Sequence, residues 1–441
     1  MNEWFAKNVV YRSIQMVRKE KVLKYLSTIK EIPWYSRDEI EDIQRQKLFK
    51  TLKCAYKNIP YYHNLFDQYG IEVEKLKLPE DVCKIPILTK DDFREHNSSL
   101  INRNENKRLS YEKTSGTSGK PLTICIDRDK SAHIRAQMFR NYDWYHIHIG
   151  DKQGRFWGVP VAKRSFIKEK IKDILANRIR LSAFEINDIS FNKFVKKLIR
   201  FKPKYFYGYP SLIYEFCQWL INRGIELKDL NLLAIITSGE VLYDFQRELI
   251  EKCFGCKVAN EYGATEIGVI AFECTEGNLH INSDHVYLET IKSDKSGDLG
   301  QIIVTELDNY YNPLIRYKIG DLGTITDIKC KCGSGFPIIM NLVGRDNSFI
   351  ITDDNRYIYP AVFHYIFNNG GIKQFQGIQK TKTELLIKII KKDDLTEVML
   401  KDYKDKLSNI LGNSMIIKFD IVDRIEKHKS GKLRYFVPFK E

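Results

Sequence analysis

The chain of 441 residues lacks the long apolar segments that mark membrane-spanning and secreted proteins. No stretch approaches the ~20 apolar residues that a helix needs to cross a bilayer. The first thirty residues contain no signal-peptide core, because basic residues interrupt the apolar ones throughout. The nine cysteines are an odd number without the spacing of a small disulfide framework, which indicates a reducing compartment. We therefore expect a cytoplasmic protein without a transmembrane segment.

Recognition motifs for nucleic acids are also absent, although the formal net charge is +14. The sequence contains no zinc finger, RNP-type aromatic motif or helix-turn-helix signature. Basic clusters at residues 163–172 and 196–204 are interrupted by apolar residues at helical spacing, which favours solvated helix faces over a nucleic-acid surface. The positive field would instead attract a small polyanionic substrate. The first thirty residues predict a basic amphipathic helix, for which packing on the body of the protein is favoured over contact with an anionic membrane.

The residues that are present indicate a globular α/β protein, with 43% hydrophobic and 12% aromatic residues. Short apolar runs alternate with amphipathic segments. Residues 211–223 predict a helix with Ser211 as N-cap and Gly224 as its stop, and residues 242–254 predict a second helix that ends at Gly255. There is no internal repeat and no low-complexity linker.

The pattern changes from about residue 347 onward. The elements expected there are a strand at 385–390, a helix at 395–411 and a strand at 415–422. They predict a separate, small α+β unit. The expected domains are 1–346, with 1–80 as a helical lead-in, and 347–441.

Residues 113–122, with the sequence KTSGTSGKPL, form a loop suited to phosphate oxygens. Gly116 and Gly119 permit turns and close approach, which leaves backbone N–H groups free to face an anion. The side-chain donors of this loop belong to Thr114, Ser115, Thr117, Ser118 and Lys120. Extended runs at 108–112 and 122–126 predict a strand-loop-strand hairpin. The glycine spacing departs from the mononucleotide-binding pattern G-x-x-x-x-G-K-[ST], which argues against an ordinary P-loop NTPase.

Further polar segments follow in a fixed order. They are Thr237–Glu240, Glu261–Glu266, Arg316–Asp321, Gly344–Asn347 and Lys427–Arg434. The first two come directly after expected strands at 232–236 and 257–260, where open α/β sheets usually bind ligands. Two earlier segments are AYKNIPYY at 55–62 and KIPILTK at 84–90.

The ordered set resembles the adenylate-forming acyl-CoA synthetase superfamily, and the two early segments are similar to its phenylacetate-CoA ligase-like, CapK-like branch. The resemblance covers nearly all 441 residues. It implies a large multi-sheet N-terminal domain with a small mobile α+β C-terminal lid. It also implies ATP-dependent activation of a carboxylic acid through an acyl-adenylate, with release of pyrophosphate and transfer of the acyl group to a thiol, for which coenzyme A is expected.

The resemblance assigns roles to the matching positions. The loop 114–120 would donate to the β- and γ-phosphates. Glu266 would hold Mg²⁺, and Thr265 would reach the α-phosphate or the metal shell. Asp321 would accept from the ribose hydroxyls, and Arg345 would donate to ribose or phosphate. The resemblance implies further ATP-binding positions, among which backbone groups and the Tyr262 ring would contact adenine. They are Ser238, Gly239, Glu240, Glu261, Tyr262 and Gly263.

Lys432 is the implied catalytic lysine, alongside Thr265 and Glu266. Its ammonium, in a Ser-Gly-Lys turn of the terminal unit, would neutralise charge between the carboxylate and the α-phosphate in the transition state. Lys429 is a competing candidate and Lys427 a weaker one, and an ordinary surface lysine is the alternative for all three.

Lid rotation after adenylate formation would pivot at Asp346 and Asn347. Many relatives carry Asp or Lys where Asn347 stands, and Ser348 replaces another common acid. This departure keeps other acceptors open, namely a carrier-protein thiol or an amine or hydroxyl of a cell-surface polysaccharide. A non-catalytic nucleotide-binding relative is a third alternative, against which the joint retention of the implied ATP-binding and catalytic residues argues.

A further constellation is not needed for adenylation. Cys274, His280, Cys330 and Cys332 supply three thiols and one imidazole, the number of ligands in a closed tetrahedral zinc site. The alternative is that these separate segments never converge. Cys253 and Cys256 have C-x-x-C spacing, but core packing is favoured for both.

The acid substrate cannot be read from the sequence. Its pocket is expected between residues 156–161, 205–211 and 238–265, where Trp157, Tyr207 and Tyr209 would stack on an aryl group or fill the core. The partners expected are the carboxylic acid and an acyl acceptor, and a homodimer stays open.

Overall fold

The computed structural model describes residues 1–102, 109–113, 122–158, 163–184, 186–292, 299–345, 349–358, 360, 362–367, 370–426 and 433–439. The predicted phosphate loop at 114–120, the pivot at 346–347 and Lys432, with its competitors Lys427 and Lys429, lie outside these residues. Their assignments stay predictions.

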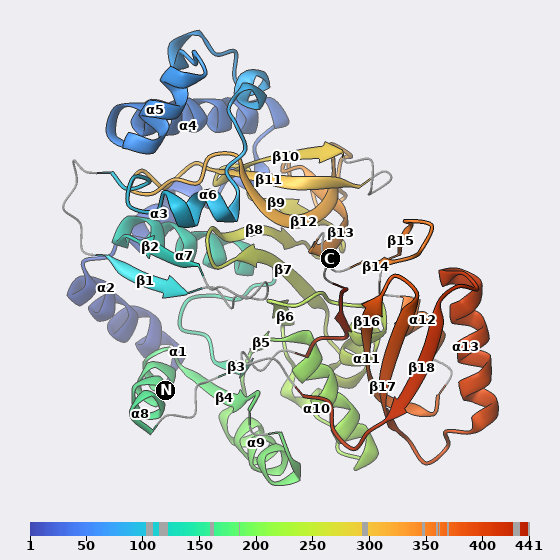
Figure 1. Ribbon diagram of the computed structural model, residues 1–441. Helices are drawn as coiled ribbons and strands as arrows, with labels where there is room; N and C mark the ends of the chain where they lie inside the picture. The colour runs from blue at the N-terminus through green and yellow to red at the C-terminus, as the bar shows by residue number, and fades with distance from the viewer. Residues whose placement is uncertain are drawn as a thin grey trace.

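One sheet of eleven strands organises most of the chain (Figure 1). Its strand order is β10-β11-β12-β13-β9-β8-β7-β6-β5-β3-β4. The parallel half consists of β3 (Gln153–Trp157), β4 (Arg178–Ser182), β5 (Tyr205–Gly208), β6 (Ala234–Ser238) and β7 (Val258–Ala264). The connecting helices are α8 (Lys163–Leu175), α9 (Asp188–Phe201), α10 (Pro210–Asn222) and α11 (Asp244–Phe254), and η5 (Lys228–Leu230) precedes β6. The α/β prediction is confirmed.

The other half of the sheet is antiparallel. It consists of β8 (Gly268–Glu273), β9 (Leu279–Ile281), β10 (Val286–Lys292), β11 (Gly300–Glu306), β12 (Tyr317–Thr326) and β13 (Ile338–Arg345). The predicted hairpin is formed by β1 (Ser110–Lys113) and β2 (Thr123–Ile126), which pair antiparallel, and β2 leads into α7 (Arg128–Asp143).

Helical segments precede the sheet in sequence. They are α1 (Glu3–Phe5), the π-helical η1 (Ala6–Tyr11), α2 (Arg12–Arg18), α3 (Val22–Ile29), α4 (Arg37–Asn58), α5 (Pro60–Gln68) and α6 (Lys90–Glu95), with short 3₁₀ turns η2 (Ile32–Trp34), η3 (Val73–Lys75) and η4 (Glu80–Lys84). Apolar residues of α4 and α5 share one core with the antiparallel strands. A second core lies between the parallel strands and the helices α9, α10 and α11.

A four-stranded sheet with the order β18-β17-β16-β19 forms a C-terminal unit, coloured orange to red in Figure 1. Its elements are β14 (Ile350–Ile351), β15 (Tyr357–Ile358), α12 (Val362–Phe367), β16 (Ile372–Thr381), β17 (Glu384–Lys391), α13 (Glu397–Leu411), β18 (Ile416–Ile421) and β19 (Phe436–Val437). The helices α12 and α13 share a core with this sheet. We call this unit the lid.

Two local predictions differ from the structure. The N-cap of α10 is Tyr209 and not Ser211, because Pro210 occupies the first helical position, where its missing N–H costs nothing. The strands predicted at 232–236 and 257–260 continue as β6 to Ser238 and as β7 to Ala264. The segments Thr237–Glu240 and Glu261–Glu266 therefore begin inside strands and not after them. The predicted end of α11 is confirmed, since Gly255 has the left-handed conformation at its C-cap.

Close strand packing at Gly208 gives a test of the fold. A methyl group on this residue would lie 2.3 Å from the backbone oxygen of Phe156 on the neighbouring strand. We expect Gly208→Ala to cost about 3 kcal/mol of stability, because backbone must move to relieve the overlap. Gly224→Ala is the control, since its added carbon meets nothing within 4 Å and only the left-handed φ of +63° opposes it, at about 1 kcal/mol. Equal midpoints of thermal unfolding for the two variants would contradict this packing.

Candidate functional site

A cavity of about 630 Å³ lies where β6 and β7 end, between the main sheet and the lid. Three polar segments that are distant in sequence contribute to its wall. The lining residues that the sequence analysis singled out are Ser238, Gly239, Glu240, Glu261, Tyr262, Gly263, Thr265, Glu266 and Asp321. Pairing of β6 with β7 places Ser238 opposite Glu261, which explains why the first two segments meet. The structure therefore brings most of the described candidate ATP-binding residues to one cavity.

Tyr262 and Asp321 form one polar contact of this wall. The Tyr262 hydroxyl donates a hydrogen bond to Asp321 Oδ2 at 2.9 Å. Burial raises the pKa of Tyr262 well above its usual value, and the neighbouring Asp321 carboxylate raises it further, so the phenol remains a donor. The bond fixes both the ring predicted for the adenine slot and the carboxylate predicted for the ribose. Arg345 is the last residue of β13, where its backbone pairs with Asp321.

The carboxylate of Glu261 is bound by side chains of the protein itself. Its Oε1 accepts a hydrogen bond from Tyr207 at 3.0 Å and its Oε2 accepts one from Tyr142 at 3.1 Å. Burial raises the pKa of Glu261, while the hydrogen bonds from Tyr207, Tyr142 and Ser238 oppose that rise. This carboxylate is thus held by the protein itself, which supports a structural part for its side chain.

Glu266 lies in the turn that joins β7 to β8 and is buried. The Tyr317 hydroxyl donates to Glu266 Oε1 at 3.4 Å. The backbone oxygen of Glu266 accepts a hydrogen bond of 2.6 Å from Lys130 Nζ. Lys130 is itself 2% exposed and forms an ion pair of 2.6 Å with the fully buried Glu306. A buried, paired lysine on α7 thus fixes the turn that carries the predicted Mg²⁺ ligand.

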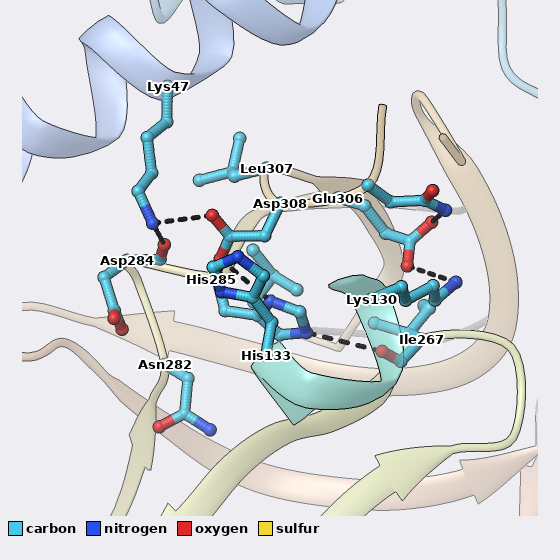
Figure 2. Close-up of polar contacts among 12 residues, drawn as sticks. Lys47, Lys130, His133, Ile267, Asn282, Asp284, His285, Glu306, Leu307 and Asp308 are labelled. Atoms are coloured by element: carbon cyan, nitrogen blue, oxygen red, sulfur yellow. Dashed lines mark hydrogen bonds and ion pairs between the residues drawn. The ribbon is translucent and has the colours of Figure 1, made fainter. Parts of the chain in front are cut away.

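Beside the Lys130–Glu306 pair, Figure 2 shows a second polar network around Asp308 that reaches the residue after Glu266. Lys47 reaches from α4 to the Asp284 backbone oxygen at 2.6 Å and to Asp308 Oδ1 at 2.8 Å. His285 lies 3.3 Å from Asp308 through Nδ1 and 3.3 Å from the Ile267 backbone oxygen through Nε2.

The pKa of Asp308 is lowered despite its burial, because Lys47, His285 and His133 surround it. The network connects α4, α7 and the segment after β11 to Ile267, the residue that follows Glu266.

Aromatic rings form another part of the wall. Trp157 and Tyr207 line the cavity, with ring centroids 5.4 Å apart in a stacked arrangement. Tyr209 stacks on Trp157 at 4.2 Å and is buried, so it supports this wall from behind. The Arg155 guanidinium lies about 5 Å from the centroids of both lining rings, at 5.0 Å and 4.9 Å. Two of the three aromatic residues predicted for an acid pocket therefore face the cavity. Residues 159–161 of that predicted pocket lie outside the described residues.

Residues of the lid close the cavity from the other side. Leu433, Arg434, Tyr435 and Phe436 line it, and they follow directly after Lys432 in sequence. Gln246 on α11 donates to the Tyr435 hydroxyl at 3.2 Å, and the Tyr243 and Tyr435 rings meet edge to face at 5.7 Å. The pairing of β19 with β16 anchors this segment to the lid. The chain that carries the predicted catalytic lysine is thus tied to the cavity on its C-terminal side.

Lys90 is a cavity residue that the sequence alone did not indicate. It lines the cavity from the start of α6, and its Nζ donates to the Ile319 backbone oxygen at 2.8 Å. The segment 84–90 was recognised only as part of a resemblance, and Lys90 is its last residue. Ile134 and Met138 on α7 were also missed, because nothing in a helix sequence shows which face meets a remote cavity.

The four predicted zinc ligands converge. The ligand atoms of Cys274, His280, Cys330 and Cys332 all lie within 4.8 Å of one another. The Cys274 and Cys330 sulfurs are 3.7 Å apart, and Cys332 Sγ lies 3.3 Å from His280 Nε2. A tetrahedral Zn²⁺ with bonds of about 2.3 Å to sulfur would separate two thiolates by about 3.8 Å.

The hydrogen bond to the outer nitrogen of His280 also suits a metal site. His280 Nδ1 lies 2.9 Å from the Phe336 backbone oxygen, which can only accept, so Nδ1 carries the proton and Nε2 faces the thiols. The cluster is separate from the cavity, because Gly268 and Cys274 lie at opposite ends of β8, roughly 20 Å apart for an extended chain. Cys253 and Cys256 pack against the core between the parallel strands and their helices, as predicted.

Comparisons with known proteins agree with the predicted resemblance. Residues 350–438 match the family model of the CapK C-terminal domain. The chain is 23% identical to protein CapK of Staphylococcus aureus over 409 residues, covering 91% of this chain and 89% of that protein. It is 24% identical to phenylacetate-coenzyme A ligase of Thermus thermophilus over 344 residues, covering 75% of this chain and 76% of that one.

The fold also matches a solved structure. The crystal structure of 2-hydroxyisobutyryl-CoA ligase in its postadenylation state, in complex with R3-HIB-AMP, superposes with a TM-score of 0.76 at 18% sequence identity. The superposition covers 93% of this chain and 92% of that chain. Sequence and fold together confirm the resemblance to the adenylate-forming superfamily and to its phenylacetate-CoA ligase-like, CapK-like branch.

The buried contact beneath Glu266 generates a prediction. Replacing Lys130 by Met together with Glu306 by Gln removes both buried charges, so neither is left without its partner. The Glu266 backbone then loses its hydrogen bond, and we expect a several-fold higher Mg²⁺ concentration for half-maximal ATP-dependent activity. Arg140→Met with Asp284→Asn is the matched control, since it removes an equally buried pair from the same helix that contacts neither Glu266 nor Ile267. Equal shifts in Mg²⁺ requirement for the two double variants would show that the Lys130 contact has no special effect on the turn.

Proposed function

We propose that this chain activates a carboxylic acid with ATP, forming an acyl-adenylate and releasing pyrophosphate, and then transfers the acyl group to a thiol, for which coenzyme A is the first candidate. The observation that carries the proposal is the cavity that joins the segments of Ser238, Tyr262, Glu266 and Asp321 and is closed by the lid. The likeness to coenzyme A ligases in sequence and fold supports it.

The first half-reaction joins two anions. A carboxylate oxygen attacks the α-phosphorus of ATP, and the bond to pyrophosphate breaks. Tyr262 and Asp321, already joined by a hydrogen bond, would hold adenine and ribose. Glu266 and Thr265 lie in the same turn, so they would hold Mg²⁺ and approach the α-phosphate together. The loop 114–120 would donate to the remaining phosphates, and Arg345 would assist at the ribose or phosphate.

Mg²⁺, when bound, would neutralise phosphate charge, and the protein's own contribution is to hold the ligands in place. The acid would enter beside Trp157 and Tyr207, whose flat rings line the cavity and fit an apolar acyl group. We propose Asp346 and Asn347 as the pivot by which the lid would turn for the second half-reaction.

In that second step the acceptor attacks the acyl carbonyl and AMP leaves. A different acceptor is favoured by one observation, the similarity to CapK over 91% of this chain together with the CapK C-terminal domain at 350–438. The alternative function is therefore acyl or aminoacyl transfer to an amine or hydroxyl in cell-surface polysaccharide biosynthesis. Both functions share the adenylate, and only the acceptor separates them.

A pyrophosphate-exchange screen tests the shared step. The purified protein is incubated with ATP, Mg²⁺, labelled pyrophosphate and single members of a panel of aryl, fatty, hydroxy and amino acids. Exchange that depends on one class of acid is expected. The acid that supports exchange is then offered with coenzyme A or with an amine, and the product that forms identifies the acceptor.

Lys432 should be required for this exchange. We expect Lys432→Ala to lower the exchange rate by about 10²-fold or more, because one preorganised cation near the reacting oxygens is lost. Lys429→Ala is the matched control in the same segment, and its expected effect is smaller. Full exchange by the Lys432→Ala protein would refute the assignment, and a large loss with Lys429→Ala alone would transfer the role to that residue.

We also propose that Cys274, His280, Cys330 and Cys332 hold a structural Zn²⁺. The convergence of three sulfurs and one imidazole nitrogen supports this, as does the proton on His280 Nδ1. The metal would join the end of β8 to the connection between β12 and β13 and stabilise this side of the sheet.

Metal analysis tests the zinc proposal. The purified protein is expected to contain stoichiometric zinc, and Cys332→Ser is expected to lose it and to unfold at a lower temperature. Cys83→Ser is the control, because Cys83 is exposed and outside the cluster, so zinc content should not change. A folded wild-type protein without zinc, measured by mass spectrometry of the metal, would rule the site out.

A further inference from the structure

The helix α8 packs on the edge of the main sheet with its charged side and turns its apolar side outward. Arg180 on β4 binds Glu169 at 3.0 Å and Asp173 at 2.6 Å, and these acids belong to the inner side of α8. The apolar residues at spacing i, i+4, i+7 and i+8 are all exposed. They are Ile167, Ile171, Ile174 and Leu175, with Ile167 at 63% and Ile174 at 61%. A surface helix ordinarily buries such a stripe.

The N-terminal segment of α1 and η1 lies beside α8 and also has exposed apolar side chains. Residues of η1 contact α8, and Figure 1 shows α1 next to α8 at the N-terminus. Ala6 is the residue of α1 and η1 that is buried, whereas Trp4, Phe5 and Val9 are exposed, Trp4 at 67%. The predicted packing of this helix on the body is thus only partial. We call the exposed apolar residues of α1, η1 and α8 the N-terminal face.

The charges around the N-terminal face are positive. Glu3 and Glu20 are the only acids among the first thirty residues. Glu3 pairs with Lys204 at 2.8 Å and Glu20 pairs with Arg135 at 2.6 Å, so the body neutralises both. The segment 1–21 also carries exposed basic residues that form no ion pair with any described residue. They are Lys7 on η1, Arg12 and Arg18 on α2, and Lys19 and Lys21 between α2 and α3. Met16 and Val17 on α2 extend the exposed apolar surface.

We propose that the N-terminal face attaches the protein to the surface of an anionic lipid bilayer. Aromatic and branched apolar side chains insert at the level of the headgroups, and lysine and arginine beside them attract anionic lipids. No described helix has the length and apolar character to span a membrane, so the attachment is peripheral. The ion pairs between α8 and β4 hold the apolar stripe outward, which spares the membrane contact the cost of reorienting the helix. This inference does not depend on the proposed reaction.

A second copy of the chain fits the same face less well. A two-fold contact would place identical basic helices against each other, and like charges at an interface oppose association. An anionic bilayer offers apolar chains to the apolar residues and negative headgroups to the basic ones. The bilayer is therefore the occupant that the charges favour.

Co-sedimentation of the full chain with vesicles tests the proposal. Vesicles of phosphatidylcholine mixed with phosphatidylserine are compared with vesicles of pure phosphatidylcholine, at low and high salt. Binding is expected to the anionic vesicles and to weaken with salt. The variant Ile167→Ser, Ile171→Ser, Ile174→Ser is expected to lower the partition coefficient at least about tenfold. These side chains are exposed, so its unfolding temperature should stay near that of wild type.

The matched control is Val398→Ser, Ile416→Ser, Ile421→Ser on the lid, which replaces three equally exposed apolar residues outside the N-terminal face and should bind like wild type. A charge variant, Lys7→Glu with Arg12→Glu, should lose binding to anionic vesicles. No binding of wild type to anionic vesicles, or unchanged binding of the α8 variant, would overturn the proposal. Concentration-dependent dimers that disappear in the α8 variant, without vesicle binding, would also overturn it and assign the face to a second copy.

Discussion

The candidate site depends on β7, which pairs parallel with β6 and antiparallel with β8 in the main sheet. The parallel pairing places the end of β6 and the turn after β7 at the same edge of the sheet. Gly263 and Gly268 permit the tight turn, since a methyl group on Gly263 would lie 2.3 Å from the Gly268 backbone oxygen. The residues of the turn then face the cavity, and the buried Lys130 and His285 hold the turn from the protein side. Catalytic geometry of this kind needs such support from behind.

The wall of the cavity contains residues of both the main sheet and the lid. The main sheet supplies Tyr262, Glu266 and Asp321, and among the described residues Pro360, Leu433, Arg434, Tyr435 and Phe436 line the cavity from the C-terminal unit. Tyr435 meets α11 and its N-cap through a hydrogen bond from Gln246 and an edge-to-face contact with Tyr243, whereas the lid has an apolar core of its own. A contact of this type is suited to being broken and remade. The proposed two-step chemistry requires that property, because the acceptor must reach the same carbonyl after the nucleotide has reacted.

Sequence reasoning predicted the elements that local patterns specify. Alternating strands and helices gave the α/β class, and the position of two polar segments near parallel strand ends predicted that they would meet. Sequence reasoning failed where contacts between residues distant in sequence determine the structure. Nothing local shows that Lys130 reaches Glu266, since 136 residues separate them. The outward stripe of α8 was unexpected for the same reason, because its orientation is set by Arg180 on a strand that the helix precedes.

A crystal structure of the protein with ATP and magnesium tests the central claim most directly, because that claim is spatial. We expect adenosine beside the Tyr262–Asp321 pair and the triphosphate beside Glu266, inside the cavity between the main sheet and the lid. A triphosphate bound elsewhere on the protein, with this cavity unoccupied, would contradict it.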